Sequence, residues 1–553
     1  MQRLYMFMFL FFHAVVVHAV GPAVKNSGVS EKALRQSQPD YRLQKNETPT
    51  LIESEISDVP EITGPSLFIN KIIVEGNSLL PEALIADIVE IGDGREMSLG
   101  ELKFMVNRIS HAYAKAGYVL VRAYLPQQEI VDGRVTIEVL QGKIASISAS
   151  DSERYASDDI VESFNGLVGS DTLTADELQH SLLNLNDVVG ISARSVLKAG
   201  VTTGATDMVV NVEEKRPYKI SLDADNFGSE FTGENRYGVT ALAGSMFTFG
   251  DELMFRGVTS NGEQNYINLL YRLPVIGLNT FVNASYVYSN QQLGSNLAPL
   301  KAKGDSNIST LSVSHYWKRT RSYEIAFDVG FSDRSYNNEQ LGITTSDDHL
   351  ANLFVGVKGF FDDSFRARTY YSVLLQAGLT GGDTSDPLNS RLNGRSDAVI
   401  GLVNLTRYQG VPVLDSYFVL KASGQWADRR VLSPDLYAAG GMGTVRGYPL
   451  AEIAGDNAVL ISAEYIVPFP YKKSISLFTF IDHGATFVNE PLLGEKDKNI
   501  TGAGFGVRVN IMPSNNSMPS VDLMATYATP VLGSQTPSDD SSSVFYLGGV
   551  VTY

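Results

Sequence analysis

The stretch Tyr218-Lys219-Ile220-Ser221-Leu222-Asp223-Ala224-Asp225 decides the fold of this chain. Apolar and polar residues alternate strictly along it, so an extended strand would carry one apolar and one polar face. This pattern is typical of a transmembrane β-barrel strand, which turns one face to lipid and the other to a wet lumen. Similar runs recur at residues 237–243, 265–273, 280–289, 307–317, 323–332, 351–361, 368–379, 416–426, 460–467, 476–480, 502–510, 521–527 and 544–553.

The length of this region predicts the size of the barrel. About 335 residues follow residue 218, which allows about 16 strands at roughly 20 residues per strand and connection. The sheet must close, because an open edge would leave backbone groups unpaired in hydrocarbon. A lumen of this width is not filled by wall side chains alone, so it is an open channel or holds a plug. A soluble β-sandwich shares the alternation but does not explain the aromatic terminus Tyr553.

The N-terminus has the features of a secretory signal. Arg3 supplies a positive charge, residues 4–12 are almost entirely apolar, and Val17-His18-Ala19 offers small residues for cleavage. An uncleaved anchor is the alternative, although the apolar run is short for a membrane span. We expect a signal peptide at residues 1–19. No later segment has about 18 uninterrupted apolar residues, so no further transmembrane helix is expected.

The composition excludes several classes of protein. The chain has no cysteine, which rules out a disulfide framework and thiolate chemistry. Its formal net charge of −17 argues against a nucleic-acid partner. The 26 tyrosines, 26 phenylalanines and 49 glycines suit an amphipathic β-rich protein better than a helical one.

A linker and the first of two similar modules precede the barrel. Residues 20–66 are polar with scattered prolines and indicate a linker. Within it, residues 30–36 are compatible with either a short helix or a disordered tail. Residues 67–142 indicate a small α/β module, with a capping box at Ser98 and Glu101 before a helix. Its other expected elements are strands at 68–77, 118–125 and 134–140 and a helix at 83–89.

Residues 143–215 repeat the same order of strands and helices. A second capping box is expected at Thr174 and Glu177, and closing strands at 191–197 and 207–212. Two tandem copies of about 75 residues make an internal repeat. The chain is therefore expected to divide into a signal peptide, the linker, two α/β modules and a barrel at 216–553.

One stretch inside the barrel region is unlike a strand: Gly440-Gly441-Met442-Gly443-Thr444-Val445-Arg446-Gly447-Tyr448. An arginine in membrane-like sequence is costly unless it faces water or a partner. The glycines permit a tight path that folds back into the lumen. Asp482 is a candidate partner, because alternation places it with Phe478 and Phe480 on the inner face and turns Ile481 to lipid. The alternative is an exposed loop in which Arg446 and Asp482 each face solvent.

Readings that involve catalysis have little support. The glycine cluster is not followed by the Lys-Ser/Thr of a phosphate-binding loop. The seven histidines show no ligand spacing, and no nucleophile is placed near His483. We expect no catalytic residues, no cofactor, no bound metal and no enzymatic activity.

Several motifs together resemble a known family. Val445-Arg446-Gly447-Tyr448 resembles a signature at a loop tip, and Phe480-Ile481-Asp482-His483-Gly484 resembles the signature of the wall that faces it. Gly455-Asp456-Asn457 and Glu464-Tyr465 resemble the strand after the loop, and Gly117-Tyr118-Val119 resembles a periplasmic POTRA domain. In order and spacing, residues 67–553 are similar to TpsB-type transporters of two-partner secretion. These form the hemolysin secretion/activation protein family of the outer-membrane assembly-factor superfamily.

The resemblance implies a site, a location and partners. It implies a loop-tip motif of Val445, Arg446, Gly447 and Tyr448, a barrel-wall motif of Phe480, Asp482 and Gly484, and a barrel C-terminal signal of Phe545 and Tyr553. It places the barrel in the bacterial outer membrane and the POTRA domains in the periplasm. It also implies that a secreted exoprotein with an N-terminal secretion domain threads the lumen unfolded, without nucleotide hydrolysis, as in type V secretion. The resemblance further implies two more partners, outer-membrane lipid and the barrel-assembly machinery that inserts the barrel. It also implies a monomeric state and an N-terminal helix that plugs the pore.

Two other functions remain as alternatives. A barrel-assembly or insertion factor shares POTRA domains and the arginine loop, whereas a nonspecific porin needs no periplasmic receptor. Two POTRA domains, rather than three or five, favour secretion over assembly.

Overall fold

The computed structural model describes residues 27–36, 66–150, 152–170, 172–261, 264–381, 384–469, 472–511 and 518–553. The expected signal peptide at 1–19 lies outside the described residues, as does the expected linker except for residues 27–36 and 66. The chain divides into two compact units. One comprises Met1–Lys45, Arg216–Lys318 and Ser322–Tyr553, and the other comprises Asn46–Lys215 and Arg319–Arg321.

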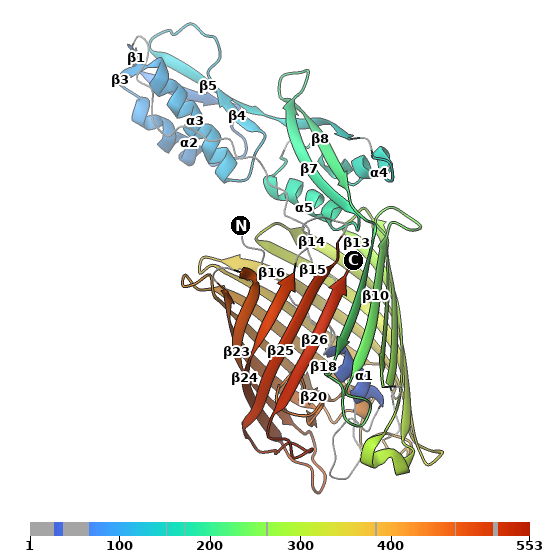
Figure 1. Ribbon diagram of the computed structural model, residues 1–553. Helices are drawn as coiled ribbons and strands as arrows, with labels where there is room; N and C mark the ends of the chain where they lie inside the picture. The colour runs from blue at the N-terminus through green and yellow to red at the C-terminus, as the bar shows by residue number, and fades with distance from the viewer. Residues whose placement is uncertain are drawn as a thin grey trace. The chain divides into compact units, whose positions relative to one another are not determined.

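The first unit is built around a closed antiparallel barrel, and the described residues form the sixteen strands that the sequence length predicts (Figure 1). The last strand pairs with the first, with Gly548 opposite Asp225 and Thr552 opposite Ser221, so the sheet has no free edge. The strands are β9 Tyr218–Asp225, β10 Arg236–Gly244, β11 Glu252–Ser260, β12 Gln264–Ile276, β13 Thr280–Gln292, β14 Lys303–Arg319, β15 Tyr323–Gln340, β16 Ile343–Asp363, β17 Ala367–Gly378, β18 Val399–Gly410, β19 Tyr417–Ala427, β22 Asn457–Phe469, β23 Lys472–Phe487, β24 Lys498–Ile511, β25 Ser520–Gly533 and β26 Val544–Thr552.

Alternation along the strands separates a lipid face from a lumen face. Leu222 is 57% exposed on the outside of β9, whereas its neighbours Ser221 and Asp223 are buried. On β23, Ile481 is 53% exposed while Phe480 and Asp482 are buried. The exposed row is apolar because it faces hydrocarbon, as the alternating pattern predicts.

Two strands, β11 and β18, are absent from the runs recognised in the sequence. Both carry apolar residues on each face, which removes the alternation. On β18 the inward side chains Ile400 and Leu402 are buried in a cluster with Leu436 and Tyr437, which belong to a loop inside the barrel. The neighbouring residues Val403 and Leu405 remain exposed on the outer face. A barrel strand that packs against a lumen segment therefore loses its polar face.

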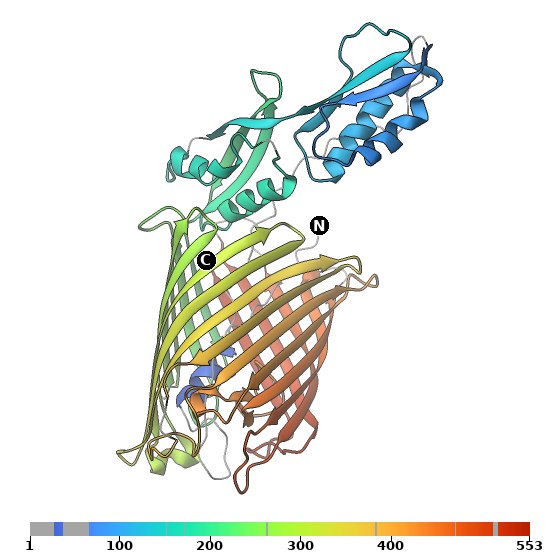
Figure 2. The same cartoon turned by 180° about the vertical axis from the view of Figure 1, so that it is seen from behind.

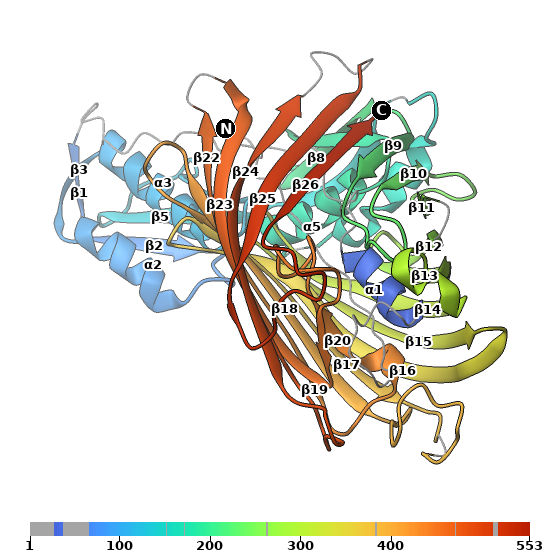
Figure 3. The ribbon, with the colours of Figure 1, turned by 60° about the horizontal axis from the view of Figure 1, so that its bottom comes forward.

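The helix α1, Ser27–Gln36, belongs to the barrel unit and lies inside the ring of strands (Figure 2, Figure 3). It begins three residues before the expected segment 30–36. The Ser27 amide donates to Asn338 Oδ1 of β15 at 2.9 Å, and Lys32 Nζ donates to the Leu436 carbonyl at 2.9 Å. Lys32 and Glu31 are fully buried, so the helix occupies part of the lumen.

The second unit holds two modules with the same topology. In each, a central strand pairs parallel with one neighbour and antiparallel with the other, giving the sheet orders β2-β5-β4 and β6-β8-β7. The first module contains β2 Lys71–Glu75, α2 Glu82–Val89, η3 Glu90–Gly92, α3 Leu99–Lys115, β4 Val121–Tyr124 and β5 Arg134–Gln141. The second contains β6 Lys143–Ala149, α4 Ser157–Glu162, η4 Asn165–Leu167, α5 Ala175–Asn186, β7 Ile191–Ala199 and β8 Ala205–Glu214.

Both predicted capping boxes are present. The Glu101 amide donates to Ser98 Oγ at 3.3 Å, and Glu101 Oε2 accepts from the Ser98 amide at 2.8 Å. Thr174 and Glu177 make the same reciprocal pair before α5. The strand expected at 68–77 is in fact two strands that break at Asn70, because β1 Ser66–Ile69 pairs separately with β3 Arg95–Ser98.

Candidate functional site

The connection between β19 and β22 folds back into the lumen as a hairpin. Its stem is the strand pair β20 Tyr437–Ala439 and β21 Ile453–Gly455, which lies inside the barrel (Figure 3). A short η6 turn, Ser433–Asp435, precedes the stem. The tip, residues 440–452, includes the glycine-rich stretch singled out in the sequence. Val445, Arg446 and Tyr448 are all buried, so the tip is packed against protein rather than exposed.

Glycines make this path possible. Gly440, Gly441 and Gly447 have φ of +128°, +89° and +94°, a region that other residues rarely adopt. At Gly447 an added Cβ would also lie 2.8 Å from the carbonyl carbon of Thr529 on β25. The tip therefore needs glycine here both for its backbone angles and for its close approach to the wall.

The guanidinium of Arg446 faces two carboxylates on the barrel wall. Its Nε and Nη2 donate to Asp482 Oδ2 and Oδ1 at 2.7 and 2.9 Å, a bidentate pair. Its Nη1 donates to Glu464 Oε2 at 2.7 Å. The backbone amide of Arg446 also donates to Asp482 Oδ2 at 3.2 Å, so the carboxylate holds both the side chain and the main chain of the tip.

The wall carries its own partners for these carboxylates. Glu464 Oε1 pairs with Arg508 Nη2 of β24 at 2.6 Å, and Asp482 Oδ1 accepts from Ser462 Oγ at 2.6 Å. Arg446 and Arg508 therefore balance the charges of Asp482 and Glu464. We call these four residues the tip ion cluster: Arg446, Asp482, Glu464 and Arg508. Its pairs are charge-assisted and mostly buried, which makes them strong and sensitive to the loss of one member.

Aromatic rings support the two arginines. The Arg446 guanidinium lies 3.4 Å from the ring centre of Phe480, and that of Arg508 lies 4.3 Å from the ring centre of Phe478. Both rings point into the lumen, as alternation along β23 predicts. Each guanidinium is thus held by hydrogen bonds in its plane and by a ring on its face.

A row of glycines on β24 makes room for the tip and for the rings. Gly502, Gly504 and Gly506 lie directly opposite the inner-face residues Asp482, Phe480 and Phe478 of β23. An added Cβ at Gly504 would lie 2.7 Å from Phe480 Cζ, and one at Gly502 would collide with the Arg446 carbonyl oxygen. The backbone of the loop tip therefore rests directly on the bare backbone of the wall.

The remaining predicted site residues fall into two groups. Val445 packs near Gly484, where an added Cβ would lie 3.0 Å from Val445 Cγ2, and the Tyr448 hydroxyl donates to the Leu532 carbonyl at 3.2 Å. These residues surround the tip ion cluster. Phe545 and Tyr553 do not, since they are 54% and 48% exposed at the end of the chain. Their role as a barrel C-terminal signal stays a prediction.

Glu464 and Arg508 join the site although the sequence did not assign them a role in it. Both are charged residues at inward positions of barrel strands, and that signal would have identified them. The Glu464-Tyr465 motif contains Glu464, whereas none of the motifs contains Arg508 on β24.

The arrangement is suited to holding a loop against the barrel wall. Within the described parts of the chain, no three His, Cys, Asp or Glu residues are grouped as a metal site. No described helix is long and apolar enough to cross a membrane. What the tip ion cluster can do is keep the hairpin inside the lumen or, when broken, release it.

Comparisons with known proteins agree with this geometry. The sequence model of the family described as haemolysin secretion/activation protein ShlB/FhaC/HecB matches residues 204–509, more than half of the chain. A model described as POTRA domain, ShlB-type, matches residues 67–142.

Two curated relatives and one solved structure are similar over most of the chain. The heme/hemopexin transporter protein HuxB of Haemophilus influenzae strain 86-028NP is 26% identical over 426 residues, 75% of each protein. The outer membrane transporter CdiB of Escherichia coli O6:K15:H31 is 21% identical over 442 residues, 76% of this chain and 73% of CdiB. A solved structure of CdiB from Escherichia coli has the same fold, with a TM-score of 0.73 at 18% identity over 91% of this chain and 94% of CdiB.

The closed barrel, the POTRA-type modules before it and the match over residues 204–509 lead to one conclusion. The chain belongs to the haemolysin secretion/activation protein family, the outer-membrane transporters of two-partner secretion.

Proposed function

We propose that this transporter secretes one partner exoprotein through its barrel, and that the inward hairpin is the gate that the exoprotein must displace. The observation that carries the proposal is the contact between Arg446 and Asp482, with Nε and Oδ2 2.7 Å apart. It holds a loop across the lumen by a few side chains on one wall. A permanent plug would not need a polar, breakable attachment at its tip.

The POTRA modules offer places to bind an extended client. In the described residues the outer strands of the two sheets are β2 and β4 in the first module and β6 and β7 in the second. An outer strand presents unpaired backbone groups to which a client segment can add as a further strand. We propose that the N-terminal secretion domain of the exoprotein binds in this way, and that the following chain is passed unfolded into the barrel.

Passage requires the lumen to clear. Both α1 and the hairpin lie inside the barrel, so both must move or be displaced for a polypeptide to cross. The proposal includes no nucleotide hydrolysis and no enzymatic activity, since the site contains only structural ion pairs. Folding of the exoprotein outside the cell would then favour its exit.

We propose a cleaved signal peptide at 1–19, a linker at 20–66, POTRA domains at 67–142 and 143–215 and a barrel at 216–553. The exposed apolar face of the barrel contacts outer-membrane lipid, and Phe545 and Tyr553 guide insertion by the barrel-assembly machinery. The transporter acts as a monomer.

A secretion assay tests the function. Candidate exoproteins from neighbouring genes are expressed with the transporter, with its Arg446→Ala variant, and without it. Secretion is expected with the wild-type transporter and not without any transporter. The Arg446→Ala variant should reach the membrane but secrete less, because its hairpin tip is no longer held in a defined position on the wall. Arg395→Ala is the control, because Arg395 pairs with Asp397 at the surface with 41% of its side chain exposed. Wild-type secretion by Arg446→Ala would disprove the gating role.

The same strains separate secretion from outer-membrane protein assembly. Loss of the transporter should leave the levels of other outer-membrane barrels unchanged. A general loss of those barrels would instead identify an assembly or insertion factor.

A further inference from the structure

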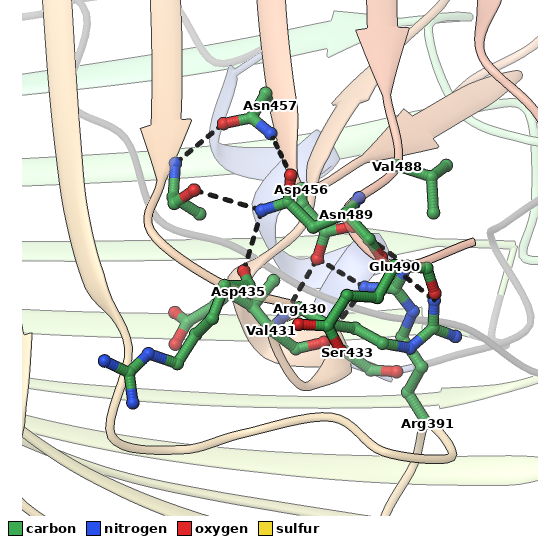
Figure 4. A network of polar contacts seen from close by, with 12 residues as sticks. Arg391, Arg430, Val431, Ser433, Asp435, Asp456, Asn457, Val488, Asn489 and Glu490 are labelled. Carbon is green, nitrogen blue, oxygen red and sulfur yellow. Dashed lines mark hydrogen bonds and ion pairs between the residues drawn. The ribbon is translucent and has the colours of Figure 1, made fainter.

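The hairpin stem has an aspartate at each side of its base (Figure 4). Asp435 lies just before β20 and Asp456 directly follows β21. Their exposed fractions are 1% and 0%. Neither residue contributes to the tip ion cluster. Two buried carboxylates at the base of one stem require partners, because an unpaired buried charge is strongly unfavourable.

Asp456 receives four hydrogen bonds from three separate connections. Arg391, in the β17–β18 connection, donates through Nη1 to Oδ1 at 2.5 Å and through Nη2 to Oδ2 at 3.0 Å. The Val431 amide, in the hairpin connection itself, donates to Oδ1 at 2.7 Å. The Asn489 amide, in the β23–β24 connection, donates to Oδ2 at 2.8 Å. One carboxylate therefore joins three neighbouring loops at the same end of the barrel.

Asp435 is held by a different part of the wall. Its Oδ1 accepts from Arg334 Nη1 of β15 at 2.9 Å, and Arg334 is itself fully buried. Gln425 of β19 then links the two sides of the stem. Its Nε2 donates to the carbonyls of both Asp435 and Asp456 at 2.8 Å. We call these five residues the stem clamp: Asp435, Asp456, Arg334, Arg391 and Gln425.

A second ion pair reinforces the clamp beside Asp456. Arg430 donates to both oxygens of Glu495 at 2.7 and 2.8 Å, and its Nε donates to the Leu392 carbonyl at 2.9 Å. Glu495 lies in the β23–β24 connection and Leu392 in the β17–β18 connection. The same three loops are thus joined twice.

The tip and the base of the hairpin differ in which polar groups would lose their partners if that end moved away from the wall. If the tip withdraws, Glu464 keeps its ion pair with Arg508, and Asp482 loses its cation but keeps the hydrogen bond from Ser462. If the base withdraws, Arg391 loses its bidentate pair with Asp456 and keeps a longer contact with Glu495 at 3.9 Å, while the amides of Val431 and Asn489 lose their acceptor. Unsatisfied buried backbone groups are costly. Release at the tip is therefore easier than release at the base.

We propose that Asp456 and Asp435 are positioning residues that hold the stem as a fixed hinge, so that opening is confined to the tip. The inference rests on the proposed function only in treating tip release as the opening step. The stem clamp fixes the position of the stem in the lumen. The tip ion cluster holds the tip against the wall, and the tip is released when this cluster breaks. The β17–β18, β19–β22 and β23–β24 connections then move, or stay, as one body.

A disulfide reporter measures the position of the stem without any exoprotein. The chain has no cysteine, so an engineered pair is the only one that can form. Ala439→Cys with Gly484→Cys joins the stem to the wall, since the Ala439 Cβ lies 3.3 Å from an added Cβ at Gly484. Crosslinking is followed in purified full-length protein, and bilayer conductance is recorded on the same variants without the cysteines.

Asp456→Asn keeps the volume and removes the charge. It should slow stem crosslinking by about tenfold or more, since a broken buried pair shifts an equilibrium by at least that factor. It should also raise conductance. Arg446→Gln should raise conductance while stem crosslinking stays near the wild-type rate. Asp362→Asn, which breaks the pair with Arg368 beside the β16–β17 turn, is the control and should change neither.

Two results would overturn the inference: wild-type crosslinking in folded Asp456→Asn, or equal loss of stem crosslinking in Arg446→Gln. A difference in electrophoretic mobility between heated and unheated samples establishes that the barrel of each variant is folded. If Asp456→Asn does not fold, Gln425→Ala takes its place. It is likewise expected to slow stem crosslinking and to raise conductance. Because no client is present, a failure of secretion does not affect these measurements.

Discussion

Removal of the Arg446 guanidinium should open the pore. Arg446→Ala deletes a bidentate pair with Asp482 and a third hydrogen bond to Glu464, at 2.7 to 2.9 Å. Breaking a buried pair by removing one partner costs about 3–5 kcal/mol. Glu464 keeps Arg508 as an ion partner, and only Asp482 loses its cation, so we use the lower figure.

A change of about 3 kcal/mol shifts the balance between the inserted and released tip by about 150-fold. If wild-type protein is closed nearly all the time, the variant should be open for a readily measured fraction. Arg446→Lys should lie between the two, because lysine keeps the charge but loses the bidentate geometry.

Single-channel recordings of the purified full-length chain in planar bilayers provide the assay. The quantity measured is the fraction of time at high conductance. Arg395→Ala serves as the control, since its exposed pair with Asp397 contributes about 1 kcal/mol or less. An unchanged open fraction in folded Arg446→Ala would show that the tip ion cluster does not hold the gate closed.

Three further predictions follow from other contacts. Gly502→Ala should displace the tip and raise conductance, because its Cβ would collide with the Arg446 carbonyl. Gly401→Ala should not, because its Cβ would make only an ordinary contact with Trp426 at 3.9 Å; equal conductance in the two variants would contradict this. Hydrogen bonds hold the pKa of Glu101 below its usual value, and the one from the Ser98 amide has the largest effect. The ionised Glu101 therefore stabilises the fold above about pH 4.3, and this stabilisation is lost as the pH falls through the lower pKa of the folded state. Thermal melting of a fragment spanning 66–215 should therefore lose this acid dependence in Glu101→Gln, and an unaltered profile would exclude the effect. Deletion of 67–142 should abolish capture of the exoprotein in a pull-down, and unchanged capture would refute recognition by the first POTRA domain.

Alternation in the sequence was sufficient to predict the barrel and the direction of most side chains. It placed Asp482 on the inner face, and the glycines around Arg446 suggested a loop folded inward. The contact at 2.7 Å agrees with both inferences. These features were predictable because a barrel strand in lipid has only two faces and the sequence must separate them.

Features that depend on what fills the lumen were harder to predict. The strand β18 was missed because Ile400 and Leu402 pack against the hairpin stem, so its inner face is apolar. The stem clamp was missed because Asp456 and Arg391 are far apart along the chain, in loops that show no periodic pattern. A short segment such as α1 gains its order from buried contacts in the barrel, and its sequence alone left helix and disorder equally open.

The glycine row on β24 has a consequence for which polypeptides can pass. Where Gly502 meets the Arg446 carbonyl, the nearest loop atoms are main-chain atoms, and the Val445 side chain lies farther away, 3.6 Å from an added Cβ. Every polypeptide has the same main chain. Once the hairpin withdraws, the wall backbone at Gly502 loses its cover, while Gly504 and Gly506 remain beneath the rings of Phe480 and Phe478. A polypeptide that passes Gly502 would meet main chain there, so this point of the wall would place little demand on the composition of the cargo.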